Sequence, residues 1–152
     1  MLEVDRNNVF ALTDLAWSKL YAGSIEEVIP GLERAIRLSP RDRRIGLWYY
    51  RIGVVHLLQS RNDDALVCFE KARSTEPSAP FVYVHLASAY ALKGETGHAA
   101  VELAEARRLV GDDRYSSITR LKAVRYFGVP KIRALFETTY FAGLRKAGMP
   151  EE

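Results

Sequence analysis

The fold is decided by residues 46–77, which read GLWYYRIGVVHLLQSRNDDALVCFEKARSTEP and recur in altered form on both sides. The segment from Val9 to Pro40 aligns with the segment from Gly46 to Pro77 at an offset of 37 residues. A second offset, of 34 residues, carries the central unit onto the next one. Aligned positions hold apolar residues of similar size. The large ones are Leu15, Ile52 and Leu86, and Leu32, Phe69 and Leu103; the small ones are Ala16, Gly53 and Ala87, and Ala35, Ala72 and Ala106. The three extra residues of the first offset fall in the turn around residues 40–42, and a period close to 34 residues indicates a repeat architecture.

Each unit is expected to form two helices joined by a tight turn. Apolar residues recur at helical spacing in the first helix of the first unit, at Leu12, Leu15, Ala16 and Leu20. Gly23 is expected to end that helix in the left-handed conformation, and Ser24 with Glu27 is expected to cap the next helix. Gly94 takes the place of Gly23 in the third unit and Ser60 takes it in the middle unit.

The packing of each pair is predicted from the size of its residues. Small residues stand where two helices must approach closely, at Ala16, Gly53, Ala65, Ala87 and Ala99. The first unit is irregular, because Pro30 and Gly31 lie inside its second helix. Proline removes a backbone donor, so a kink is expected there. Lys19 also occupies the position that holds His56 and Tyr90 in the other units.

These positions resemble the tetratricopeptide repeat (TPR), a helix-turn-helix unit of 34 residues with small, large and terminal-proline positions in this order. The resemblance covers Val9 to Gly111 in three units, at about residues 9–42, 46–79 and 80–113. Gly111 departs from it by replacing the closing proline of the third unit. The resemblance implies an all-α fold, a right-handed α-α superhelix (TPR solenoid) of three helix pairs.

The two ends of the chain lie outside these units. Residues 1–8 read like the last turn and exit of another repeat's second helix, so we expect a truncated preceding repeat and a larger parent protein. Residues 112–152 are expected to form a C-terminal capping helix pair over the open end of the stack. Asp112 and Asp113 would open a helix from about Arg114 to Tyr126, and Phe127–Pro130 would break it. A last helix from about Lys131 places on one stripe the residues Ile132, Leu135, Phe136, Tyr140, Leu144 and Ala147.

A narrower resemblance rests on three motifs of the tail. Residues 114–118 read RYSSI, residues 130–132 read PKI and residues 142–150 read AGLRKAGMP. They resemble the closing region of bacterial proteins, common in rhizobia and their relatives, in which a repeat array follows a class III adenylate or guanylate cyclase domain or a winged-helix DNA-binding domain. The resemblance implies an upstream signalling or regulatory domain of either kind. Cyclase catalytic residues do not occur in this sequence.

Composition excludes several classes of protein. The chain has 152 residues, 48% of them hydrophobic, and its apolar runs are too short to span a bilayer. The single cysteine, Cys68, cannot form an internal disulfide, which is typical of a reducing, cytoplasmic compartment. A net charge of +3, from 22 Lys and Arg against 19 Asp and Glu, is too mild to indicate nucleic-acid binding. Acidic residues also interleave with the basic clusters at Arg41, Arg43 and Arg44 and at Arg107, Arg108, Arg120, Lys122 and Arg125.

The sequence offers no constellation for catalysis. His98 follows Glu95 by three residues, which is half of a carboxylate-bridged metal motif, but a partner set is missing. We therefore expect His98 to be solvated, His56 to be a packed interior ring and Cys68 to be an inert side chain. The prediction is a non-enzyme without metal or cofactor.

The resemblance implies that partner peptides lie on the concave side, which is lined by the first helix of each unit. The predicted binding residues are Thr13, Trp17, Leu47, Tyr50, Arg51, Val54, Phe81, Val84, His85 and Ser88. Some relatives hold a peptide carboxylate with paired Lys and Asn, but Thr13, Trp17 and Tyr50 stand at those places here. An apolar or helical segment is therefore the expected ligand, although Trp17 and Tyr50 could instead pack against neighbouring repeats.

Two functions follow from this interpretation. The first is a protein–protein interaction scaffold that recruits a protein partner or couples it to an attached cyclase. The second is an oligomerisation or regulatory arm of a winged-helix transcriptional regulator. Self-association of the isolated chain would favour the second function or a cyclase dimer.

Overall fold

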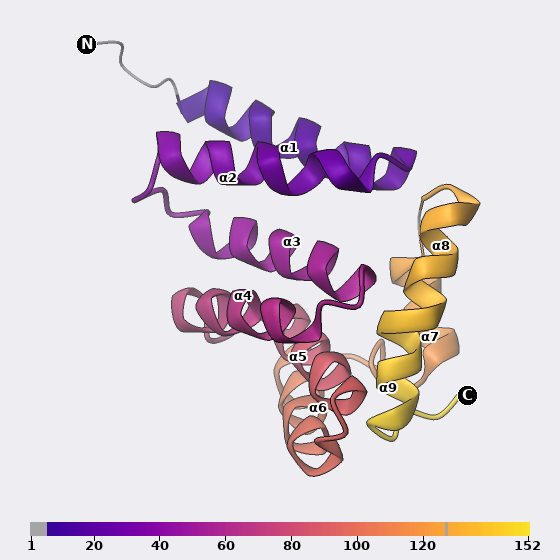
Figure 1. The fold of residues 1–152 in the computed structure, drawn as a ribbon. Helices are drawn as coiled ribbons and strands as arrows, with labels where there is room; N and C mark the ends of the chain where they lie inside the picture. Colours follow the sequence, from indigo (N-terminus) through magenta and orange to yellow (C-terminus); the bar gives the residue numbers. More distant parts are fainter. Residues whose placement is uncertain (1–5, 127) are drawn as a thin grey trace.

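The computed structural model describes residues 6–126 and 128–152, and all regular elements of that part of the chain are helices. The three expected pairs are α1 (Arg6–Ala22) with α2 (Val28–Leu38), α3 (Ile45–Leu58) with α4 (Asn62–Thr75), and α5 (Pro80–Leu92) with α6 (Thr96–Val110). The tail contains α7 (Ile118–Arg125), α8 (Pro130–Phe136), the π-helix η2 (Glu137–Phe141) and α9 (Ala142–Lys146). Figure 1 shows the three pairs stacked on one another and the tail running along one side of them.

Close packing within the pairs depends on the small residues that the repeat pattern singled out. A Cβ atom added to Gly53 would lie 2.6 Å from the ring of Phe69 in the partner helix. Ala65 and Ala99, on the second helices, are completely buried. The prediction that these positions mark the approach of paired helices is confirmed.

The turns inside the pairs adopt the expected left-handed backbone. Gly23 and Gly94 have φ angles of +99° and +85°, a region that glycine enters without a steric penalty. Ser60 occupies the same region with φ of +61°, although it carries a side chain. The shape of the turn is thus kept in the middle unit without its glycine.

The second helix of the first unit differs from the prediction in two ways. It opens with a single 3-10 turn, η1 (Ile25–Glu27), and becomes α-helical at Val28. Pro30 therefore lies in the first α-helical turn, where its missing N–H would have no acceptor within the helix, and the predicted kink is wrong. The capping box is also absent, because the Glu27 N–H bonds to the carbonyl of Ser24 and the Ser24 side chain caps nothing. The Glu27 carboxylate lies 3.4 Å from Nζ of Lys19 instead.

Among the described residues, no helix covers the outer face of α1 in the way that the equivalent faces of α3 and α5 are covered. In the second and third units the preceding second helix packs on this face, α2 on α3 and α4 on α5. Ile52 is consequently 5% exposed and Leu86 is 0% exposed, whereas the equivalent Leu15 is 59% exposed. Residues 1–5, on which the hypothesis of a preceding repeat depends, lie outside the described residues. Residues 6–8 belong to α1 itself.

The helix after the repeats begins later than expected. Asp112 accepts the N–H of Arg114 at 3.0 Å and forms a local turn in place of the predicted helix start. The hydroxyl of Ser117 then accepts the N–H of Arg120 at 3.2 Å, which makes Ser117 the N-cap of α7. Gly128 and Val129 separate α7 from α8, and Phe127 of the predicted break lies outside the described residues.

The last helices pack on the third unit and also reach along the first helices of the repeats. Elements α8, η2 and α9 follow one another without interruption from residue 130 to residue 146, and we call this segment the C-terminal run. Its main contacts are with the first helices of two units, from α9 and η2 to α5 and from η2 to α3. At its start the N–H of Val129 bonds to the carbonyl of Tyr21 at the end of α1. The C-terminal run therefore crosses the inner side of the repeats from the level of α1 to that of α5 (Figure 1).

Candidate functional site

The first helices α1, α3 and α5, which were predicted to line the concave side, carry all ten predicted binding residues. Six of these side chains are buried in this structure, namely Thr13, Tyr50, Val54, Val84, His85 and Ser88. Four are half-buried, namely Trp17, Leu47, Arg51 and Phe81. The ten residues are thus divided between a covered part and a more open part of the same face.

Two members of the covered part, His85 and Ser88 of the third unit, lie directly against the C-terminal run. The ring of His85 stacks on the ring of Tyr140, with centroids 4.4 Å apart and planes 18° from parallel. The hydroxyl of Ser88 donates to the carbonyl oxygen of Tyr140 at 2.8 Å. Gly143 packs against Ser88 so closely that an added Cβ would lie 2.6 Å from the Ser88 carbonyl oxygen. The chain's own helix thus fills the part of the face where His85 and Ser88 were expected to meet a partner.

A hydrogen-bonded chain joins the second and third units behind this contact. Nδ1 of His85 lies 2.7 Å from the carbonyl oxygen of Phe81, and because a carbonyl only accepts, Nδ1 carries the proton. In the neutral ring Nε2 is then an acceptor, and it lies 3.3 Å from the hydroxyl of Tyr50. The Tyr50 ring also packs edge-on against the rings of Phe81 and His85, at 4.7 and 4.9 Å. This chain of contacts fixes the orientation of His85.

The more open part lies in the first unit and is aromatic. The rings of Trp17 and Tyr21 meet edge-on with centroids 5.7 Å apart. The guanidinium of Arg51 lies over the indole of Trp17 at 5.3 Å, and its Nη1 is 3.2 Å from the Asp14 carboxylate. Cation–π contact and ion pair together hold Trp17 on the inner face of α1.

A small cavity lies where the open and the covered parts meet. It measures about 20 Å³, which is room for one water molecule. We call the set of residues around it the aromatic slot; these residues are Trp17, Tyr21, Tyr50, Val54, His85, Phe136 and Tyr140. Sequence reasoning selected four of the seven and missed Tyr21, Phe136 and Tyr140 as site residues. Tyr21 stands one helical turn after Trp17, so the spacing could have revealed it.

Charged groups hold the outer edge of the C-terminal run. The carboxylate of Glu137 pairs with Lys122 on one side and lies 3.3 Å from Arg145 on the other. Partial burial opposes ionisation of Glu137, but these two cations outweigh it and lower the pKa of the carboxyl. Arg145 also pairs with Glu151, so the run and the segment after it are tied together.

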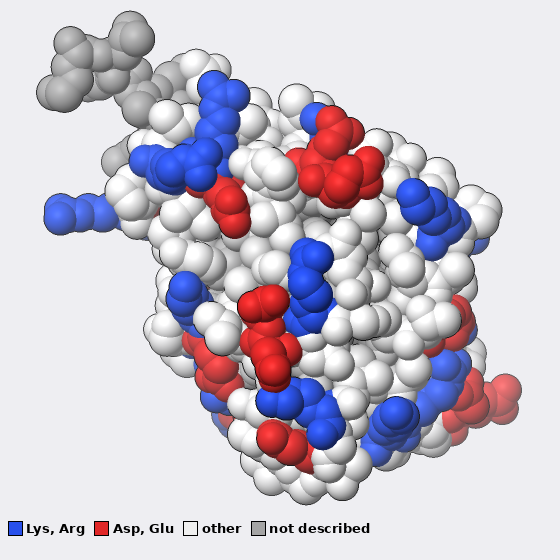
Figure 2. All heavy atoms as spheres, in the orientation of Figure 1, with Lys and Arg blue, Asp and Glu red and all other residues white. Residues whose placement is uncertain are grey.

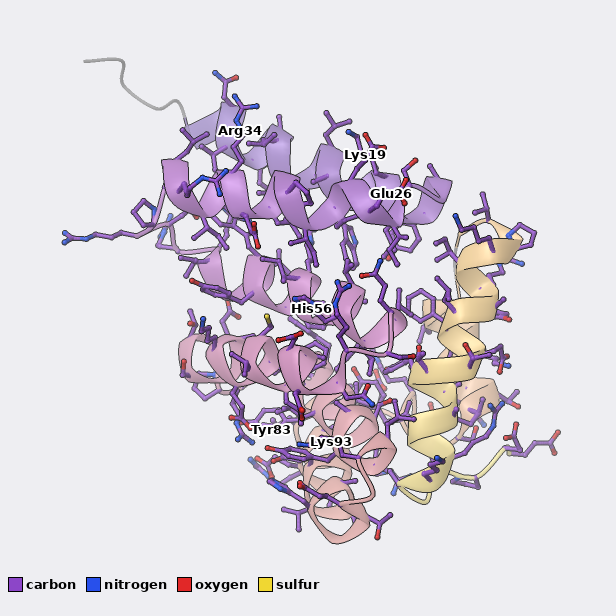
Figure 3. All side chains as sticks on the ribbon, in the orientation of Figure 1. Lys19, Glu26, Arg34, His56, Tyr83 and Lys93 are labelled. Carbon is purple, nitrogen blue, oxygen red and sulfur yellow. The ribbon has the colours of Figure 1, made fainter. Side chains whose placement is uncertain are left out.

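His56, His98 and Cys68 lie away from the aromatic slot. The side chain of His98 is 44% exposed in the first turn of α6, as predicted for a solvated residue, although its ring also stacks on Tyr90 at 3.7 Å and its Nε2 lies 3.2 Å from Glu102. His56 is half-buried and accepts a hydrogen bond from Nε of Arg61, and burial together with that charge lowers the pKa of His56. Figure 3 labels His56 on α3. Burial raises the pKa of the Cys68 thiol to about 11, which fits the predicted inert side chain. Among the described residues no group of three or more His, Cys, Asp and Glu side chains is arranged to hold a metal ion.

Several members of the basic clusters are paired with carboxylates. Arg44 bonds to Asp42 at 2.9 Å, and Arg120 lies 2.8 Å from Asp113. Figure 2 shows both signs of charge interspersed on the face that it displays. The side chain of Arg125, the last member of the second cluster, lies outside the described residues. Within the described part of the chain, none of the helices has the length and apolar character needed to cross a membrane.

Comparisons with known proteins define the class of fold. No protein-family model matches the chain, and no curated protein matches it. Among solved structures, the chain is similar to the Yersinia enterocolitica type III secretion chaperone SycD in complex with a peptide of the translocator YopD. The TM-score is 0.66 and the sequence identity is 18%, and the match covers 90% of this chain and 95% of the SycD chain. An alternative dimer of SycD from the same organism is similar with a TM-score of 0.67 and 19% identity, over 97% and 100% of the two chains.

A Thermobaculum terrenum O-GlcNAc transferase carrying the K341M substitution is also similar, with a TM-score of 0.69 and 16% identity. The match covers 91% of this chain but only 27% of the transferase chain. At these identities the likeness concerns the fold alone. It confirms the predicted all-α, TPR-like α-α superhelix of helix pairs.

Proposed function

We propose that this chain is a non-catalytic scaffold for protein–protein interaction and that it binds an apolar or helical segment of its partner on the concave face. The observation that carries the proposal is the aromatic slot, where Trp17 and Tyr21 remain half-buried beside a small cavity. Further support comes from SycD, a protein of the same fold that is found in complex with a peptide of YopD.

The chemistry of the slot suits a peptide side chain better than a reaction. Tryptophan, tyrosine and arginine are enriched in binding hot spots. Tryptophan and tyrosine bury a large area at a small cost in conformational entropy, and arginine adds charge and stacking on aromatic rings. Trp17, Tyr21 and Arg51 provide this combination, with Asp14 holding the guanidinium in place. We expect an aromatic or aliphatic anchor of the partner to pack on the half-buried rings of Trp17 and Tyr21.

The proposal is tested by selecting displayed peptides on the immobilised full chain. Peptides with apolar anchors at helical spacing should be enriched, and Trp17→Ala should weaken their binding by about tenfold or more. Lys19→Ala on the same helix is the matched control, because Lys19 faces α2 and not the slot. Enrichment that is insensitive to Trp17→Ala would move the binding site elsewhere on the molecule.

We propose further that the scaffold is the C-terminal region of a larger cytoplasmic signalling protein, such as an adenylate cyclase. The support is the resemblance of the tail motifs, whose residues also have defined contacts here: Gly143 packs on Ser88, and the carbonyl of Pro150 accepts the N–H of Ile118. The alternative is an oligomerisation and regulatory arm of a winged-helix regulator. Both include self-association of the chain as a homo-oligomer.

Mass spectrometry of the native polypeptide separates these contexts. A mass well above that of the 152 residues would support an upstream domain, and sequencing its amino end would distinguish cyclase from DNA-binding regulator. A mass near 17.2 kDa would indicate a free-standing adaptor and overturn the larger-protein proposal.

A further inference from the structure

We infer that the C-terminal run is an internal occupant of the partner-binding groove and that the natural partner is an amphipathic helix of matching chemistry which takes its place. The inference rests on the proposed interaction function and adds two points to it: the kind of partner and the way in which access to the groove is controlled.

The C-terminal run docks in the way that a ligand helix docks in a groove. Its inward side chains recur every fourth residue and are buried, at Ile132, Phe136, Tyr140 and Leu144. They lie against first helices, the side of the repeats that the resemblance assigns to ligands, with α9 and η2 on α5 and η2 on α3. An apolar stripe laid into an apolar groove is a common mode of peptide recognition by helices.

Two contacts give the groove its selectivity for such a helix. The ring of His85, held by Phe81 and Tyr50, presents a flat surface that Tyr140 covers. Ser88 admits only a glycine at position 143, because any Cβ there would collide with the Ser88 backbone. We therefore expect the partner helix to carry an aromatic residue followed three positions later by glycine.

The backbone of the run is adapted to this groove. Residues 137–141 form a π-helix, a rare variant that often marks a functional site. Within it the carbonyl of Tyr140 accepts the hydroxyl of Ser88, which lies 52 residues earlier in the chain. The run thus presents a main-chain acceptor to the groove in addition to its side chains.

The outer edge of the run is held by contacts that can be exchanged. Its charged pairs, Glu137 with Lys122 and with Arg145, are partly exposed to solvent. Such pairs contribute little to stability. The neighbouring aromatic slot is half-open at Trp17 and Tyr21, so an incoming helix can make its first contacts there. The partner binds only molecules whose groove is empty. Its apparent association constant is therefore the intrinsic constant multiplied by the fraction of molecules in which the run has left the groove.

The test uses the full chain and a synthetic peptide of residues 130–149. Gly143→Ala should dislodge the run through its collision with Ser88, whereas Gly97→Ala is the matched control because a Cβ there meets nothing within 4 Å. We expect the peptide to bind the Gly143→Ala chain at least tenfold more tightly than it binds the unmodified chain or the Gly97→Ala chain. A peptide carrying Tyr140→Ala should lose this binding, because it lacks the ring that stacks on His85.

Hydrogen exchange supplies a readout that does not depend on the peptide. In the unmodified chain, amides of residues 130–146 should exchange at least tenfold faster than those of α3 to α6. Gly143→Ala should increase this ratio of exchange rates. Equal protection in the run and in α3 to α6 would overturn the inference. So would unfolding of the whole chain by Gly143→Ala, or the same affinity of the peptide for all three chains. If displayed peptides still bind at Trp17 in that case, the proposed function stands and only the displacement of the run is lost.

Discussion

The concave face has a closed end and an open end, although both are built from the same positions of one repeat. In the third unit His85 and Ser88 lie beneath Tyr140 and Gly143. In the first unit Trp17 faces the aromatic slot and stays half-buried. The repeat supplies the same scaffold at both ends, so the difference comes from the path of the C-terminal run. The accessible surface of a repeat protein is therefore decided partly by segments that do not belong to the repeats.

The largest expected effect contrasts the two ends directly. Tyr140→Ala removes a ring that is 2% exposed. It should weaken the packing of the run and lower the free energy of unfolding by about 3–5 kcal/mol. Trp17→Ala removes a half-buried ring at the open end and should lower the free energy of unfolding by only about 1 kcal/mol. Urea denaturation of both variants, with hydrogen exchange of residues 130–146, measures the difference. Equal losses would show that the two ends are packed alike.

A smaller effect is expected for the polar contact at the closed end. Ser88→Ala removes the hydrogen bond to the Tyr140 carbonyl and leaves that acceptor buried without this partner, at a cost of about 1–2 kcal/mol. Ser18→Ala is the control, because its hydroxyl makes an equivalent bond to Leu15 on the exposed surface. Its effect should be close to zero. A comparable shift of the urea midpoint in both variants would contradict the special role of Ser88.

The smallest effect concerns pH. The pKa of Glu137 is lowered in the folded chain, so its contribution to stability is complete above the unfolded value of about 4.3 and is lost as the pH falls through the folded value. The urea midpoint of each chain is measured at pH 6 and at pH 3. The loss of unfolding free energy between these two pH values should be about 0.5–1 kcal/mol larger in the unmodified chain than in Glu137→Gln. An identical fall in both chains would mean that the Lys122 and Arg145 pairs add nothing to the docking of the run.

Much of the repeat architecture could be predicted because its determinants are local. Helical spacing gave the paired helices, and the small residue at Gly53 marked a contact whose partner, Phe69, follows at a fixed distance in the same unit. The left-handed turn at Ser60 was predictable from its alignment with Gly23 and Gly94. Each of these features depends on residues within one repeat, where sequence distance and spatial distance agree.

The features that the sequence did not predict depend on contacts between distant segments. The stripe from Ile132 to Leu144 shows that one side of a helix is buried, but it does not show what buries it. The run was therefore expected to cover the end of the stack, and its packing along α5 and α3 was not predicted. The kink predicted at Pro30 was wrong for a different reason: helix periodicity does not distinguish an α-helical start from a preceding 3-10 turn.

The attachment of the C-terminal run to α1 also determines the order in which the molecule can be completed. The bond from Lys131 to Gly23 joins residues that are 108 positions apart, whereas each helix pair forms from neighbours in sequence. Local contacts form before distant ones because closing a long loop costs more chain entropy. During synthesis the three repeats leave the ribosome before residues 130–146 do, and domains fold as they emerge. The helix pairs can therefore form before the C-terminal run reaches the groove.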